Sequence, residues 1–157
     1  MSWLSIVKSV VEGCMPVLTK EEVRELGRSI TAMLLWCSRP GAIEGVCTRF
    51  FSIVKELITV LHNSRVPWHG AEGEGVDASF LKRVSEIIRE YYEALLTSIS
   101  DSERNVYIEI VRSFEYKGKK YPRGYNTFIP LEDAVLLSSL GLVRVLRIPG
   151  LLEKIRL

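Results

Sequence analysis

The chain has 157 residues and a mass of 17.8 kDa, with 47% hydrophobic residues, 25% charged residues and a formal charge of +2. With only 11 glycines and 6 prolines, it has the composition of an ordered globular protein, which excludes a collagen-like, low-complexity or disordered chain. The longest apolar stretches are far shorter than the ~20 residues that a bilayer crossing needs. We therefore expect a cytoplasmic protein.

The charge is distributed unevenly along the chain. Residues 1–112 carry 13 basic and 15 acidic side chains, whereas residues 113–157 carry 8 basic and 4 acidic ones. Because the hydrophobic periodicity also changes after Arg112, we expect two domains: a helical bundle over 1–112 and a small, basic, β-rich domain over 113–157.

The first 112 residues have apolar positions at helical spacing. Two capping-box patterns, Thr19 to Glu22 and Ser100 to Glu103, indicate helix starts, because each hydroxyl and carboxylate would satisfy the other residue's free amide. The pattern predicts five helices, over residues 2–11, 19–37, 40–61, 77–99 and 100–111. The fold class that follows is mainly α: a five-helix bundle followed by a small α+β domain.

The last 45 residues alternate apolar and polar side chains instead. Residues 114–121 predict a hairpin that turns at Gly118, and residues 125–129 predict another extended segment. Pro130 can open a short helix over 131–140, which Gly141 can end in the left-handed conformation. Residues 142–148 alternate again and predict a closing strand.

Groups able to carry chemistry are sparse. Cys14, Cys37 and Cys47 lack zinc-ligand spacing, and two of them lie in apolar helical stripes, so we expect reduced, mostly buried thiols. His62 and His69 lie in or beside a glycine-containing loop, where we expect solvated side chains.

Enzymatic motifs are also missing from the sequence. Residues 72–75 (EGEG) have the glycines of a phosphate loop, but they lack the following Lys and their carboxylates would repel phosphate. No nucleophile elbow, zinc-protease helix or paired acidic motif is present. The sequence predicts a non-enzymatic protein with no catalytic, cofactor or metal site; the minor alternative is an enzyme using His62, His69 and the loop acids.

A basic run interleaved with tyrosines lies within the predicted hairpin and the segment directly after it. It favours either a charged strand edge that resists unwanted pairing or a contact with nucleic acid or a partner protein. Its members are Lys117, Lys119, Lys120, Tyr121, Arg123 and Tyr125.

The helix predicted over 77–99 has a wide apolar face. Apolar side chains at helical spacing fill either a core or a subunit interface. The candidates for an interface are Phe80, Val84, Ile88, Tyr91, Tyr92 and Leu95.

Several strings in the last third resemble one known family. They are residues 114–124 (FEYKGKKYPRG), 128–134 (FIPLEDA) and 140–143 (LGLV), together with Leu137. These strings are similar to the small B domain of the subunits of the GINS complex. Residues 100–107 (SDSERNVY) resemble the acidic cap and tyrosine with which that class enters its last bundle helix. A helical domain before the small domain resembles the archaeal type with the A domain first.

The resemblance implies a non-catalytic scaffold subunit. Such subunits associate through their helical domains, and they join the MCM replicative helicase to a RecJ-like partner during DNA replication. The sister GINS-like subunit, MCM and the RecJ-like protein are therefore the expected partners. The alternative is a helical nucleic-acid-binding accessory module, such as a non-catalytic primase subunit, that contacts DNA through the basic hairpin.

Overall fold

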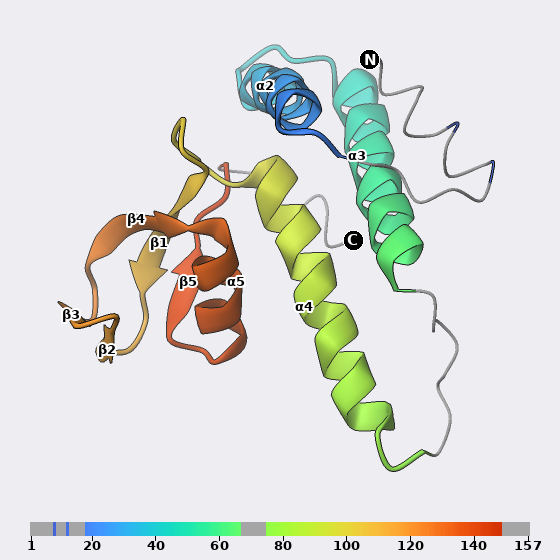
Figure 1. Cartoon of the computed structure of the whole chain (residues 1–157). Helices are drawn as coiled ribbons and strands as arrows, with labels where there is room; N and C mark the ends of the chain where they lie inside the picture. Colours follow the sequence, from blue (N-terminus) through green and yellow to red (C-terminus); the bar gives the residue numbers. More distant parts are fainter. Residues whose placement is uncertain (1–7, 9–11, 13–17, 67–74, 149–157) are drawn as a thin grey trace.

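The computed structural model describes residues 8, 12, 18–66 and 75–148. Within them, three long helices, α2 (Lys20–Cys37), α3 (Glu44–Arg65) and α4 (Ala78–Thr97), precede five short strands and one further helix, α5 (Leu131–Ser139). Figure 1 shows α4 running between the other two long helices and the strand-containing part of the chain. The helix predicted over 2–11 lies outside the described residues, apart from Lys8.

Helix α2 begins where the sequence predicts. The amide of Glu22 donates to Thr19 Oγ1 at 3.3 Å, and the Thr19 amide donates to Glu22 Oε2 at 3.0 Å. These hydrogen bonds from Thr19 lower the pKa of Glu22, because they favour its charged form. The capping box at this position is confirmed.

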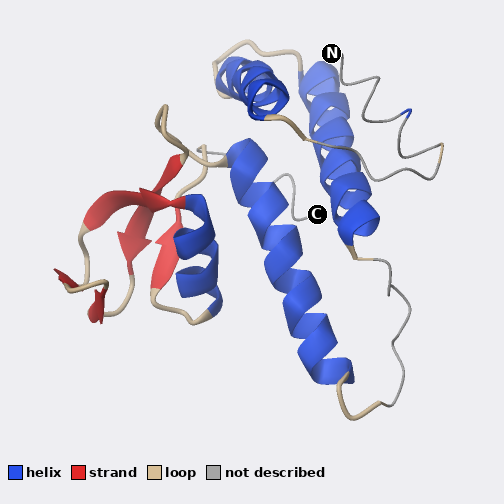
Figure 2. Ribbon diagram, in the orientation of Figure 1, coloured by secondary structure: helices blue, strands red, loops and turns tan. Residues whose placement is uncertain are grey.

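The predicted fifth helix over 100–111 is wrong. Asp101 Oδ1 accepts hydrogen bonds from the amides of Glu103 and Asn105, at 2.8 and 2.9 Å, and closes a tight turn in which Arg104 has a φ of 68°. Strand β1 (Asn105–Ile110) follows. The protein is therefore not a five-helix bundle: the part of the chain that the structure describes contains four helices, a three-stranded antiparallel sheet and a separate two-stranded hairpin (Figure 2).

Strand β1 is the centre of a three-stranded sheet of order β4-β1-β5. It pairs antiparallel with β4 (Asn126–Pro130) and with β5 (Val143–Val145). One face of β1 is buried and the alternate residues are half-buried, so this sheet is covered mainly on one side. Since β1 precedes the expected domain boundary at 112 and its two partners follow it, the sheet is built from both sides of that boundary.

The small hairpin is confirmed, with β2 (Phe114–Tyr116) paired to β3 (Lys119–Tyr121). The two turn residues, Lys117 and Gly118, both have positive φ, 51° and 72°, which is the conformation of a type I′ turn. Gly141, with φ of 70°, follows α5 as predicted.

Helix α4 contributes to two hydrophobic cores. Tyr92 and Leu96 pack with α2 and α3, whereas Ala94, without exposed surface, packs with the sheet and α5. Tyr91 and Leu95 border both cores. The helix thus joins the two parts of the molecule through buried side chains on more than one face.

An ion pair adds to this junction. Arg147 Nη1 lies 3.2 Å from Glu93 Oε2 and donates to Thr97 Oγ1, also at 3.2 Å. The Arg147 side chain is only 7% exposed, so its charge requires this partner. The segment after β5 is thereby held against the C-terminal end of α4.

The prediction of reduced thiols is wrong for two cysteines, because Cys37 and Cys47 form a disulfide. Cys37 is the last residue of α2 and Cys47 lies in the first turn of α3, with Cα atoms 5.7 Å apart. The short turn between the helices brings the two side chains together, which helical periodicity alone does not reveal. Cys14 lies outside the described residues.

We predict that reduction of this disulfide lowers stability. A cross-link that closes a short loop stabilises by about 2–3 kcal/mol, mainly by restricting the unfolded chain. Thermal unfolding with and without a phosphine reductant should show a melting temperature several degrees lower in the reduced protein. The C37A/C47A double variant should melt at the same temperature in both conditions. Equal melting of the wild type in the two conditions would contradict the prediction.

Candidate protein and nucleic-acid interfaces

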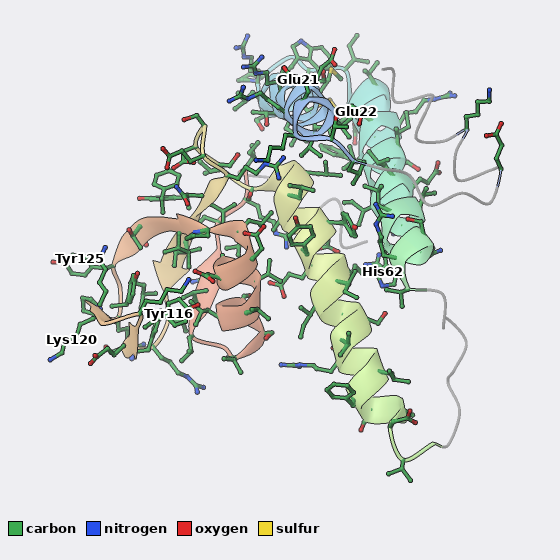
Figure 3. All side chains as sticks on the ribbon, in the orientation of Figure 1. Glu21, Glu22, His62, Tyr116, Lys120 and Tyr125 are labelled. Atoms are coloured by element: carbon green, nitrogen blue, oxygen red, sulfur yellow. A yellow bond between two sulfur atoms is a disulfide. The ribbon has the colours of Figure 1, made fainter. Side chains whose placement is uncertain are left out.

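The basic hairpin lies at the edge of the molecule, on the side away from α3 (Figure 3). Its first cation, Lys117, is already engaged within the chain. Lys117 Nζ donates to Asp133 Oδ2 at 2.7 Å, and the Tyr116 hydroxyl donates to Asp133 Oδ1 at 3.0 Å. The hydrogen bond from Lys117 lowers the pKa of Asp133, and the same bond raises the pKa of Lys117. The hydrogen bonds from Lys117 and Tyr116 to Asp133 hold the hairpin against α5.

Tyr121 is part of the hairpin's packing. Its ring is half-buried and stacks on Phe114, with centroids 4.9 Å apart and planes inclined by 10°. Lys119 Nζ lies 5.6 Å from the centroid of the Tyr121 ring. A nucleobase would therefore compete with Phe114 for this tyrosine.

The remaining candidates of the hairpin region are exposed. Lys120 lies opposite Glu115 in the strand register without an ion pair between them within the described residues. Arg123 uses its amide to bind Ser113 Oγ, and its side chain is exposed. The side chain of Tyr125 is 67% exposed, and Figure 3 shows Lys120 and Tyr125 at the outer edge. Together with Lys119, whose side chain is also exposed, these three residues are the accessible part of the predicted contact.

The predicted interface on α4 is divided between the core and the surface. Tyr92 is buried and its hydroxyl accepts a hydrogen bond from Arg65 Nε at 3.1 Å. Ile88, Tyr91 and Leu95 pack against the core formed with α2 and α3. Val84 is half-buried, whereas Phe80 is 67% exposed. Of the six residues, Phe80 presents the most apolar surface to a partner.

Two exposed leucines of the next helical segment were not among the predicted site residues. Leu136 on α5 and Leu140 directly after it are 54% and 66% exposed. Arg83 of α4, one helical turn after Phe80, donates to the carbonyl of Ser139 at the end of α5, the residue before Leu140. We call Phe80, Leu136 and Leu140 the α4–α5 apolar surface. Leu136 and Leu140 are four residues apart and lie outside the buried face of α5. This spacing is the sequence signal that could have revealed the α4–α5 apolar surface.

The more exposed face of the three-stranded sheet carries a pair of aromatic side chains. Tyr107 of β1 lies opposite Phe128 of β4, with ring centroids 4.9 Å apart. Phe128 is 44% exposed. Aromatic side chains are enriched in the buried centre of protein interfaces, so this face is a further candidate contact.

His62 does not lie in a solvated loop as predicted. It belongs to α3 and is 9% exposed, with Nε2 2.9 Å from Ser85 Oγ and Nδ1 3.1 Å from Asn63 Oδ1. The histidine thus links α3 to α4 (Figure 3). His69 lies outside the described residues. In the ranges that the structure describes, no three His, Cys, Asp or Glu side chains are arranged to hold a metal ion.

Helices of the described ranges are either too short or too polar to span a bilayer. Comparisons with protein-family models, with curated proteins and with solved structures found no match for this chain.

We predict that Asp133→Asn destabilises the protein in a pH-dependent manner. Asp133 has a lowered pKa in the folded protein. Its contribution to the free energy of unfolding is therefore complete above the ordinary pKa of an aspartate, and it is lost as the pH falls through the lower pKa of the folded state. The melting temperature of the variant should be lower than that of the wild type at neutral pH, and the difference should shrink between about pH 5 and pH 2. Glu132→Gln, at the exposed neighbour, should show no such convergence. A difference independent of pH would contradict the assigned role.

Proposed function

We propose that this chain is a non-catalytic scaffold subunit of a GINS-like complex that supports the replicative MCM helicase in DNA replication. Its partners in this proposal are a sister GINS-like subunit, MCM and a RecJ-like protein. The observation that carries the proposal is the α4–α5 apolar surface, which adjoins the segments that resemble the small GINS domain.

The arrangement of the resembling strings supports the proposal. Residues 114–124 form the hairpin and the turn after it, residues 128–134 form the end of β4 and the start of α5, and residues 140–143 lead into β5. These segments make one packed unit with β1, whose core includes Ala134 and Leu137. The strings therefore coincide with the structural framework of the small unit rather than with scattered surface positions.

Exposed apolar side chains support an assembly function. Phe80, Leu136 and Leu140 are each more than half exposed, and Leu136 is exposed although both of its neighbours along α5 are buried. Burying such side chains in an interface stabilises a complex by about 1.5–3 kcal/mol each. A scaffold that binds several partners needs surfaces of this kind and no catalytic group.

The proposal places the protein in the cytoplasm. Disulfides are uncommon there except in hyperthermophilic organisms, so the Cys37–Cys47 bond must resist cellular thiols. Cys47 is 2% exposed, which restricts the attack of a reducing thiolate on its sulfur.

Affinity purification of the tagged chain from its own organism tests the proposal. Mass spectrometry should identify a sister GINS-like subunit, MCM and a RecJ-like protein in the eluate. The F80S/L140S variant should lose the sister subunit, because about 3–6 kcal/mol of interface burial is removed. Ile43→Ser removes an equally exposed apolar residue, 63% exposed at the start of α3, and should retain it. An eluate of wild type without GINS-like and MCM proteins would overturn the proposal.

The alternative, a nucleic-acid-binding accessory module, is favoured by the accessible cations around the hairpin. Lys119, Lys120 and Arg123 are exposed, and Tyr125 offers an exposed ring for stacking. Lys117 contributes less to this alternative, because its charge is paired with Asp133.

Fluorescence anisotropy of a labelled single-stranded oligonucleotide across a salt series separates the two functions. In the scaffold function, binding is weak and the K119S/K120S/R123S variant differs little from the wild type. In the alternative, each lost phosphate contact flattens the salt dependence by roughly 0.7 log unit. Sub-micromolar binding that collapses in the triple variant would make nucleic acid the primary partner. Circular dichroism confirms that the variant is folded.

A further inference from the structure

A groove of about 740 Å³ lies between α2 and the segment that joins α4 to β1. Figure 1 shows α2 above the C-terminal end of α4, next to the loop that leads into β1. One wall consists of α2 residues from Lys20 to Leu35, and the other includes Ser98 and Ser100 to Arg104. The groove is separate from the hairpin and from the α4–α5 apolar surface.

Basic side chains line this groove at regular intervals. Lys20, Arg24 and Arg28 lie four residues apart on α2, so their Cα atoms are spaced by about 6 Å along the helix. Arg104 adds a fourth cation from the opposite wall. In the part of the chain that the structure describes, none of the four forms an ion pair.

Two carboxylates also line the groove, but they do not neutralise it. Asp101 uses both oxygens within its own turn, accepting from the amides of Glu103 and Asn105 and from Asn105 Nδ2 at 2.9 Å. Glu21 is the second. Four cations therefore face two carboxylates, which leaves the groove positive.

The opposite wall is held in an unusual backbone conformation. Arg104 has a φ of 68°, a left-handed value that is unfavourable for a residue with a Cβ. The hydrogen bonds to Asp101 on either side of Arg104 hold this turn. Strained residues that the surrounding structure maintains are concentrated at binding sites.

The floor of the groove is apolar, with Val23, Leu95 and Leu96 among the lining residues. Gly27 lies in the wall formed by α2, inside the helix, where glycine is unfavourable. A Cβ placed on Gly27 would meet no atom within 4 Å, so packing does not require the glycine. Its missing side chain instead leaves the groove open between Arg24 and Arg28.

We infer that this groove binds an extended acidic segment of a partner protein. In an extended peptide, side chains on the same face recur at about 6.6 Å, close to the spacing of the three α2 cations. Alternate carboxylates can therefore meet successive basic side chains while apolar side chains reach the floor. This inference goes beyond the proposed assembly and does not depend on it.

A single-stranded nucleic acid fits the groove less well. Proteins that bind such strands combine cations with aromatic rings on which the bases stack. None of the residues that line this groove is aromatic. An acidic peptide needs only cations and apolar contacts, and the groove offers both.

Fluorescence anisotropy with the full chain tests the inference. The probe is a fluorescein-labelled peptide in which glutamate alternates with leucine and serine, and the control peptide has glutamine in place of each glutamate. We expect the acidic peptide to bind about tenfold more tightly or better, and added salt to weaken its binding. Equal binding of the two peptides, or tighter binding of an oligothymidine of equal charge, would overturn the inference.

Three variants localise the binding. R24Q/R28Q should weaken it about tenfold or more, because two charge-assisted contacts are lost. R49Q/K55Q removes the same charge from exposed positions of α3 outside the groove and should leave binding within about twofold.

Gly27→Leu tests the groove without changing any charge. Leucine favours the helix and fills the open space beside Gly27 in the groove, so binding should fall while the melting temperature is maintained. If both double variants weaken binding equally, or if Gly27→Leu binds as well as the wild type, the peptide does not occupy this groove.

Discussion

The burial of α4 on two sides is the constraint on which the rest of the structure depends. Tyr92 and Leu96 complete a core with α2 and α3, and Ala94 completes another with the sheet and α5. A helix with apolar side chains around much of its circumference is stable only when both sides are covered. The sheet and α5 therefore cannot be regarded as an appendage, since their removal would expose one face of α4. Arg147, in the segment that follows β5, forms an ion pair with Glu93 of α4 and reinforces this contact.

The same arrangement distributes the candidate contacts over separate surfaces. Helix α4 extends past α5, so Phe80 is exposed although the middle of the helix is packed. The hairpin is fastened to α5 by Lys117, Tyr116 and Asp133, which leaves the following cations accessible. The groove beside α2 forms because α2 passes close to the turn at residues 101–104, which directly precedes β1. Each surface thus follows from how one element ends against its neighbour.

Local patterns predicted the elements whose stabilising groups are close in sequence. The capping box at Thr19, the hairpin at Gly118 and the helix end at Gly141 were all predicted, because each depends on residues within about four positions of one another. The capping pattern at residues 100–103 misled the prediction for the opposite reason. Val106, Ile108 and Ile110 alternate into the core, and pairing with distant β4 and β5 outweighs a local helix signal.

The sequence by itself determined the main helical segments, the hairpin and the candidate basic run. These features arise from periodicity and from the conformations that particular residues favour. Only the tertiary structure decided that Cys37 bonds to Cys47, that His62 is buried against Ser85 and that Tyr121 stacks on Phe114. It also decided that Lys20, Arg24 and Arg28 face Arg104 across a groove. These are relations between side chains that chain folding brings together, and one-dimensional spacing does not encode the distance between two elements or the side from which they meet.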